Sequence, residues 1–182
     1  MRISRLIGAM ACAGAIAATT PAVADDHFEE QFTFNVSAGW MYFDDDRQLS
    51  ERRVFTYGGE FRLHPNWAAE ASFSRGETKA KYGPADRQPF YDYRLDGLYY
   101  FTNDFHWQPY VALGIGEAKF RQTGETRFGT RNEVRANTGG GVRYVVSDLV
   151  SLRADVRGFW GFRDDTLDAT ASVGFGLNFT TR

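Results

Sequence analysis

Charged side chains occur at alternate positions within several otherwise apolar or small-residue segments of this chain, and they are the residues best suited to do chemistry. They are Glu60, Arg62, Glu70, Arg94, Asp96, Arg135, Arg143, Arg153, Asp155 and Arg157. Buried carboxylates can act as general acids or bases. Here arginines share the same face of the strands, and a nearby opposite charge holds a carboxylate in its ionised, paired form. We therefore expect a structural network of ion pairs and assign no catalytic residue.

Runs of acidic residues are the next candidates, because carboxylate oxygens bind divalent cations. Asp44, Asp45 and Asp46 are adjacent, and so are Asp164 and Asp165. The side chains of adjacent residues point in different directions, and such runs are usually solvated. We expect neither a metal nor a cofactor.

The segments that carry the charges have an unbroken period of two. The clearest is 167–179, whose odd positions are apolar and whose even positions are polar or glycine. Successive side chains of a strand point to opposite faces, so this segment has one apolar and one polar face. The other segments with this pattern are 32–42, 55–63, 67–73, 91–101, 107–116, 134–144 and 150–160. No helical periodicity competes over a comparable length.

The connections between these segments alternate in length. Longer polar connections at 44–53, 75–89, 121–131 and 161–166 alternate with short ones at 64–66, 102–106 and 147–148. This alternation is typical of an outer-membrane barrel with short periplasmic turns and longer external loops. We predict an all-β fold, an eight-stranded antiparallel up-and-down transmembrane β-barrel with both termini periplasmic.

The amino terminus indicates export. Arg2 and Arg5 precede a small and apolar run at 6–18, and Ala22-Val23-Ala24 offers the small residues of a cleavage site. We predict a cleavable signal peptide over 1–24 and a barrel domain over 25–182. The single cysteine lies inside the predicted signal peptide, so no disulfide is expected. Removal of the signal peptide would change the formal charge from −2 to −4, which does not favour nucleic-acid binding.

Periodicity alone leaves open which face of the barrel points outward. A soluble lipocalin-like barrel has the same alternation with its apolar face inside, around a ligand. Aromatic residues favour the membrane alternative, because they fall near both ends of the strands as two girdles would. These interface aromatics are Trp67, Phe101 and Trp107 near the short turns, and Tyr42, Phe73, Tyr91 and Trp160 near the longer loops.

The last strand resembles the carboxy-terminal β-signal of outer-membrane proteins, through Ser172, Gly174, Leu177 and Phe179. Segments 63–70 and 107–116 are similar to segments of the OmpA-like transmembrane barrel family, and the resemblance spans 28–179. It implies the transmembrane barrel of that family, recognised by the barrel assembly machinery, without the peptidoglycan-binding domain. The chain departs from the usual pattern by continuing three residues beyond the aromatic residue.

Some barrels of this kind are enzymes that modify lipid A, so the histidines are candidate general bases for a serine nucleophile. Such a catalytic site would have to lie near the outer leaflet, which contains lipid A. His64 and His106 fall in predicted periplasmic turns, and His27 precedes the first strand. All three are therefore expected to be solvated residues at the wrong end of the barrel.

The sequence thus predicts a monomeric, non-enzymatic protein of the outer membrane of a Gram-negative bacterium, with a structural or surface-interaction role. Its expected partners are membrane lipid, lipopolysaccharide and the barrel assembly machinery. A surface partner would bind through loops 44–53, 75–89 and 121–131, of which the last two are mildly basic. The alternatives are a lipid A-modifying enzyme, a narrow gated pore and a soluble periplasmic lipocalin-like ligand binder.

Overall fold

The computed structural model describes six stretches of the chain. They are 31–44, 52–78, 88–102, 106–120, 131–163 and 166–180. The predicted signal peptide, His27, both acidic runs apart from Asp44, and most of the predicted loops lie outside these residues.

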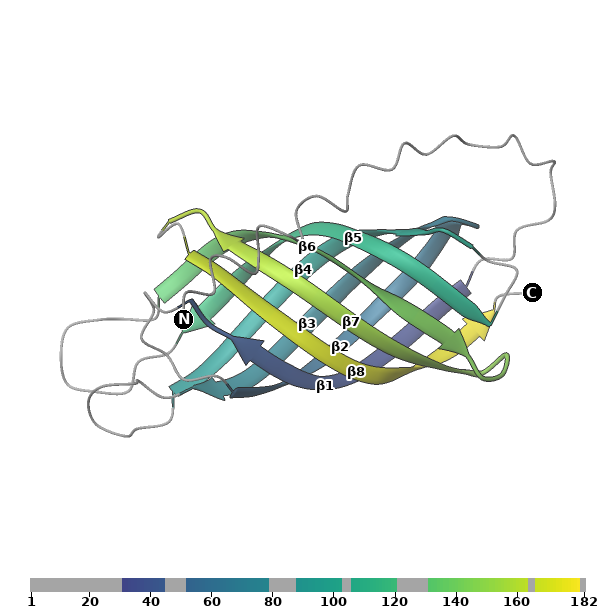
Figure 1. Ribbon diagram of the computed structural model, residues 1–182, viewed down its shortest axis with the longest axis horizontal. Coiled ribbons are helices and arrows are strands. Elements are labelled where there is room, and N and C mark those ends of the chain that lie inside the picture. Colours follow the sequence, from purple (N-terminus) through teal and green to yellow (C-terminus); the bar gives the residue numbers. More distant parts are fainter. Residues whose placement is uncertain are drawn as a thin grey trace.

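The described residues form a closed barrel of eight antiparallel strands (Figure 1). The strands are β1 (Gln31–Tyr42), β2 (Arg52–His64), β3 (Trp67–Thr78), β4 (Gln88–Tyr100), β5 (Trp107–Phe120), β6 (Arg131–Val145), β7 (Val150–Gly161) and β8 (Thr166–Thr180). Each strand pairs with the next one, and β8 pairs with β1 to close the sheet. The predicted fold class is therefore confirmed.

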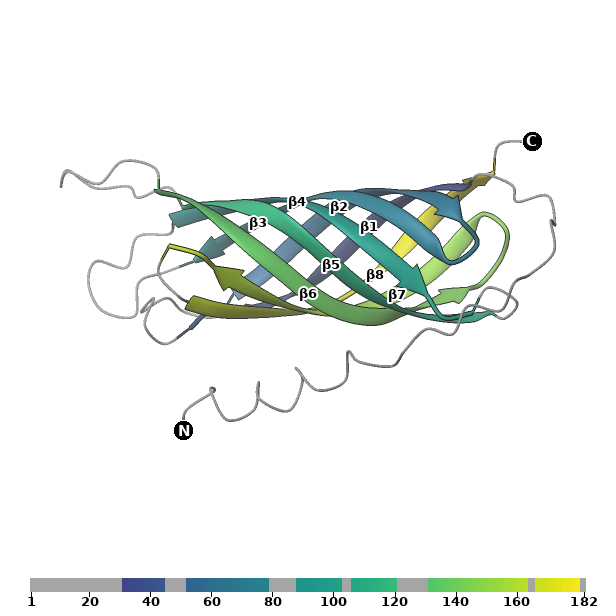
Figure 2. The ribbon, with the colours of Figure 1, turned by 90° about the horizontal axis from the view of Figure 1, so that it is seen from above.

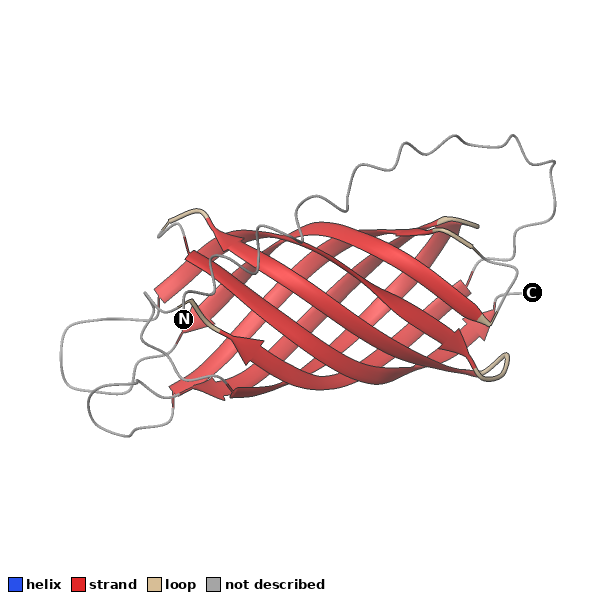
Figure 3. Cartoon of the chain, viewed as in Figure 1, coloured by secondary structure: helices blue, strands red, loops and turns tan. Residues whose placement is uncertain are grey.

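The strands are inclined to the barrel axis in both perpendicular views (Figures 1 and 2), as closure of a sheet requires. Strands make up nearly all of the described chain (Figure 3). No helix among the described residues is long and apolar enough to cross a membrane. The two ends of the barrel differ in their connections, and we name them the short-turn end (around 64–66, 101–106 and 146–149) and the long-loop end.

The structure answers which face points outward. Large apolar side chains cover the outer wall, with Leu113 69% and Val173 66% exposed. The charged side chains of the same strands point into the barrel, where Arg157 is 1% and Asp96 2% exposed. A soluble barrel with an apolar ligand cavity has the opposite arrangement. The period of two in the sequence is the direct cause, because one residue of slip would exchange the two faces.

The predicted loop 75–89 was too long. Strands β3 and β4 continue through Arg75 and Glu77, which pair with Tyr91 and Pro89. Charged residues occupy outward positions there, where the alternation requires apolar ones. The pattern therefore predicted both strands to be shorter than they are. The backbone ladder nevertheless continues, because its hydrogen bonds do not depend on the polarity of the outward side chain.

The inner wall is uneven. On β1 and β8 it is formed largely by glycine, serine, threonine and asparagine, whereas β4, β6 and β7 carry most of the charges. The long side chains fill the lumen beside the small ones. Gly141 shows how close this packing is, because a Cβ there would collide with the Ala154 carbonyl and the Tyr110 hydroxyl.

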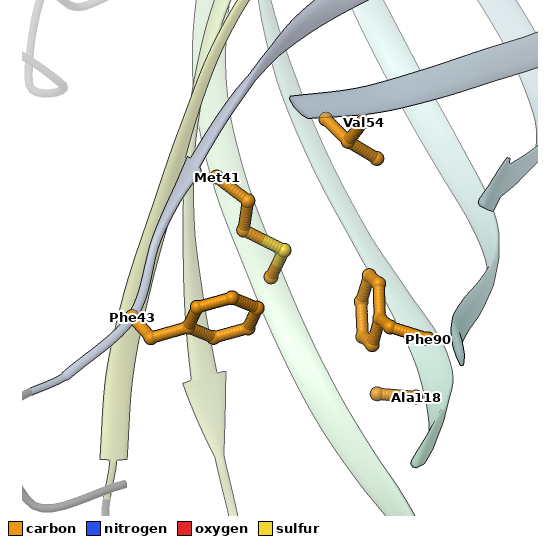
Figure 4. Packing of buried hydrophobic residues seen from close by; sticks show 5 residues of the cluster. All are labelled: Met41, Phe43, Val54, Phe90 and Ala118. Atoms are coloured by element: carbon orange, nitrogen blue, oxygen red, sulfur yellow. The ribbon is translucent and has the colours of Figure 1, made fainter. Parts of the chain in front are cut away.

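Two apolar clusters lie inside the barrel. At the long-loop end, Met41, Phe43, Val54, Phe90 and Ala118 point toward one another from β1, β2, β4 and β5 (Figure 4). The rings of Phe43 and Phe90 meet edge to face, with centroids 6.0 Å apart. Toward the short-turn end, Ala68, Leu98, Tyr100, Tyr110 and Ala112 form the second cluster. The charged residues lie mainly between and beside these clusters.

Candidate functional site

The central part of the charged interior is organised around Arg153 on β7. Its two terminal nitrogens donate to the carboxylate of Glu70 on β3, at 2.9 and 2.8 Å. Its Nε donates to the hydroxyl of Tyr110 at 2.6 Å, and that hydroxyl donates to Asp155. The arginine side chain is 7% exposed and that of Glu70 6%. Arg153 therefore joins three strands through hydrogen bonds that cross the lumen.

Arg157, four residues further along β7, has a similar set of partners. It donates to Asp96 at 2.9 Å, to Asp155 at 3.0 Å and to the amide oxygen of Asn137 at 3.3 Å. Asn137 in turn donates to Asp96 at 2.8 Å. Because these carboxylates are shared between neighbouring arginines, the ions form one network rather than isolated pairs.

Toward the short-turn end, Glu60 is the acceptor at the centre. Arg143 and the hydroxyl of Tyr100 both donate to it, the hydroxyl at 2.9 Å. Arg62 donates to Gln108 at 3.3 Å, and its guanidinium lies 4.2 Å from the centroid of the Tyr100 ring. The guanidinium of Arg143 lies 5.2 Å from the same centroid, so both arginines contact the Tyr100 ring.

Toward the long-loop end, Arg135 is the central cation. It lies 2.8 Å from Asp92 and 3.6 Å from Asp168, and its guanidinium is 4.2 Å from the Phe159 ring centroid. Asp168 also accepts a hydrogen bond from the backbone of Asp44 at 3.1 Å. The carboxylate of Asp44 accepts one from the backbone of Leu167. Asp44 is therefore part of a contact between β1 and β8, and our expectation that it is simply solvated was wrong.

The structure places all the predicted network residues inside the barrel, either in the central network or in the groups toward its two ends. Sequence reasoning missed three buried acids, namely Asp92, Glu133 and Asp168. Asp92 and Asp168 lie on inward faces that the alternation had identified, and Glu133 precedes the predicted start of its strand by one residue. Counting every charge on the inward positions, including strand ends, could have found them.

The predicted interface aromatics lie on the outer wall near the two ends. Trp67, Phe101 and Trp107 are 53%, 51% and 60% exposed near the short-turn end. Tyr42 and Trp160 are 41% and 53% exposed near the long-loop end. Phe73 and Tyr91 stack there, with ring centroids 6.2 Å apart. Ser172, Gly174, Leu177 and Phe179 of the predicted assembly signal lie on β8, in register with β1.

The interior offers little room for a substrate. The main cavity has a volume of about 30 Å³, which is enough for about two water molecules. His64 and His106 are exposed at the short-turn end, away from this cavity. The described residues contain no group of three or more His, Cys, Asp and Glu side chains able to hold a metal ion. The arrangement can bind strands together but shows no assembled nucleophile and base in its described part.

An apolar outer wall, two belts of aromatic residues and a charged, filled lumen define a transmembrane β-barrel of the outer-membrane kind. The chain belongs to the family described as outer membrane protein beta-barrel domain, whose profile matches residues 9–179. The family occurs in the outer membrane of Gram-negative bacteria and is mostly non-enzymatic. A comparison with curated proteins found no significant match.

Solved structures show the same fold. Neisserial surface protein A (NspA) of Neisseria has a TM-score of 0.66 at 15% identity, over 81% of this chain and 97% of that chain. Ail, the attachment invasion locus protein of Yersinia pestis, has 0.60 at 18%, over 84% and 100%. The N-terminal β-barrel domain of Pseudomonas aeruginosa OprF has 0.58 at 19%, over 81% and 97%. At these identities the likeness concerns the fold alone.

Proposed function

We propose that this chain is a non-enzymatic barrel that reinforces the outer membrane and contacts its outer leaflet through the long-loop end. The observation that carries the proposal is the filled interior. Its central ions bind one another across the lumen, and the main cavity, at about 30 Å³, is too small for a lipid chain or a peptide. A lumen built in this way stabilises the wall and leaves specific contacts to the outer surface.

The outer wall supports one orientation of the barrel. Among the described strand residues with described side chains, outward charges occur only at the long-loop end, on β2, β3 and β5. They are Arg53, Arg75, Glu77, Glu117 and Lys119. Arg53 lies 5.9 Å from the Trp40 ring, and Lys119 lies 5.3 Å from the Tyr93 ring. Aromatic and cationic side chains at this level suit the phosphate-bearing headgroups of lipopolysaccharide, and this supports an orientation with both termini in the periplasm.

Labelling of intact cells tests the orientation. Val146 is 52% exposed in a short turn, and Phe162 is 60% exposed next to β7 at the long-loop end. Single cysteines at these positions would be treated with a membrane-impermeant maleimide. We expect labelling of Phe162→Cys in intact cells and labelling of Val146→Cys only after lysis. The reverse result would place the termini outside the cell.

Contact with lipopolysaccharide is tested with matched charge variants. The protein would be refolded into phosphatidylcholine vesicles with and without lipid A, and its unfolding midpoint in urea measured. Lipid A should raise the midpoint, and the triple variant Arg53→Gln, Arg75→Gln, Lys119→Gln should lose most of that increase. The variant Glu77→Gln, Glu117→Gln alters the same ring without removing a cation and should keep it. Equal responses of all three proteins would refute the contact.

The proposed role in the membrane is tested in cells by deletion. Loss of the chain should increase sensitivity to bile salts and to large hydrophobic antibiotics, and the wild-type chain should restore resistance. A surface partner that binds through loops 44–53, 75–89 and 121–131 remains part of the proposal. Replacement of these loops with short turns separates the two roles, because it should abolish partner binding while the detergent resistance persists.

The absence of enzymatic activity is tested directly. Purified protein would be incubated with lipid A, and the lipid analysed by mass spectrometry. We expect unchanged acylation, because no described histidine lies near the long-loop end, where lipid A would meet the barrel. Removal or addition of an acyl chain would refute the non-enzymatic role.

A further inference from the structure

The main cavity lies between the charged wall and the wall of small residues. Its lining includes hydroxyl-bearing side chains from four strands, namely Ser37, Thr56, Ser74, Thr170 and Ser172. Arg94, Arg153, Arg157, Glu70 and Asp155 border it from the other side. Genuinely dry cavities are apolar, and this one is polar over much of its lining.

Asn35 on β1 carries the strongest indication of what the cavity holds. Its side chain is 7% exposed and lines the cavity, and neither its amide nitrogen nor its amide oxygen has a hydrogen-bond partner within the described chain. The residues paired with it are Gly58 on β2 and Gly176 on β8, which have no side chains to offer. Buried polar groups are nearly always hydrogen-bonded, to protein or to ordered water. Asn35 therefore requires a partner that both donates and accepts.

Arg94 on β4 supplies a second incompletely bonded group. Its Nε donates to Ser72 at 3.0 Å and lies 3.6 Å from Asp92. Asp92 is held more closely by Arg135, at 2.8 Å. Arg153 and Arg157 direct their nitrogens to carboxylates across the lumen, whereas only Nε of Arg94 donates to another described side chain. The remaining donors of Arg94 are available to a molecule in the cavity, which this residue lines.

We propose that the cavity is a binding site for about two ordered water molecules, which hydrogen-bond to Asn35 and Arg94 and complete the polar interior. The volume of about 30 Å³ fits this number, since one water needs at least about 10–15 Å³ of such space. A halide ion would suit Arg94 but could not donate to the amide oxygen of Asn35. Water satisfies both groups.

Buried side chains lie between the proposed site and each end of the barrel. The cluster of Met41, Phe43, Val54, Phe90 and Ala118 covers the long-loop side. On the short-turn side, Asn178 accepts hydrogen bonds from Thr33 at 3.2 Å and from Ser151 at 3.3 Å, and all three side chains are buried. Water held between these closures should exchange slowly with the solvent.

Nuclear magnetic resonance on the ¹⁵N-labelled full chain in lipid nanodiscs tests the site. Cross-peaks from water to the Asn35 side-chain amide would be measured, in both laboratory-frame and rotating-frame experiments. We expect cross-peaks whose sign indicates water bound for longer than nanoseconds. The side-chain amide of Asn137 is the internal control, because it donates to Asp96 and does not line the cavity.

Two further measurements test the same site, and the second of them needs no variant. Asn35→Leu should abolish the water cross-peaks at neighbouring hydroxyl groups while the heat-modifiable gel mobility of the barrel is retained. On the wild-type protein, replacing sulfate with chloride or bromide should leave the Asn35 resonances unshifted. Absence of water contacts at an observed Asn35 amide would overturn the proposal. A saturable halide-dependent shift would overturn it too, since the site would then hold an anion.

Discussion

The pair formed by Arg153 and Glu70 offers a quantitative test of the interior network. Two short hydrogen bonds, at 2.9 and 2.8 Å, join side chains that are 7% and 6% exposed. Removing one partner of a buried pair leaves the other charge uncompensated and costs about 3–5 kcal/mol of unfolding free energy. Arg157 lies 3.5 Å from Glu70 and compensates part of the loss. We therefore expect the lower end of that range, about 3 kcal/mol, for Arg153→Gln.

The double variant separates the interaction from the cost of each truncation. Glu70→Gln removes the negative charge that Arg153 binds, and we expect about 3 kcal/mol for it as well. Once both charges are absent, neither is left unpaired. The double variant should therefore be destabilised by about 2–3 kcal/mol less than the sum of the two single variants, which is the coupling energy of the pair.

Reversible urea unfolding in phosphatidylcholine vesicles, followed by tryptophan fluorescence and gel mobility, would measure these values. The matched control is Lys119 and Glu117 on the outer wall, 3.4 Å apart and 37% and 38% exposed. Their coupling should stay below about 1 kcal/mol because solvent screens the charges. If the inner pair is additive within about 0.5 kcal/mol, the central ion pair does not stabilise the barrel and the reasoning fails.

Three further predictions concern the outer wall, the apolar cluster and the last strand. Leu113→Arg in the middle of the apolar belt should destabilise the barrel in lipid by about 2–4 kcal/mol, and Glu117→Arg on the same face by about 0–1 kcal/mol; equal costs in urea unfolding would contradict a lipid-facing wall. Phe90→Ala should cost about 3–5 kcal/mol in the same assay, and a cost below about 1 kcal/mol would mean that the cluster closes around the gap. Phe179→Ala should slow assembly in cells, seen as unfolded precursor, more than it slows refolding into vesicles, and equal effects would argue against an assembly signal.

The fold could be predicted because the alternation within each strand identifies its apolar face and its polar face. The alternation in 167–179 defines two faces without reference to any other strand, and the same holds for the other segments. The long and short connections then order the strands as neighbours. What failed was the extent of several strands, because β2, β3, β4 and β6 reach into the predicted loops 44–53, 75–89 and 121–131. On β3, Arg75 and Glu77 interrupt the apolar face although the backbone pairing continues.

The pairs inside the lumen could not be predicted in the same way. Alternation places Arg153 and Glu70 on the inner face, but they are 83 residues apart in sequence and meet only because the barrel is closed. Which charge faces which across the lumen depends on strand tilt and register, and these depend on the whole set of pairings. The edge-to-face contact of Phe43 and Phe90 has the same origin, since both residues lie at the margins of predicted loops.

The uneven inner wall connects these findings. Long charged side chains on β4, β6 and β7 need space to cross the lumen, and the small residues of β1 and β8 provide part of it. Gly58 is an example of a small residue that leaves this space, because a Cβ there would come within 3.0 Å of the Glu70 carboxylate. Such a wall leaves the Asn35 side chain without a hydrogen-bond partner in the described part of the chain. The small residues that make room for the ion network therefore also leave the polar cavity beside it. The water proposed in that cavity is thus a consequence of how the charged side chains pack.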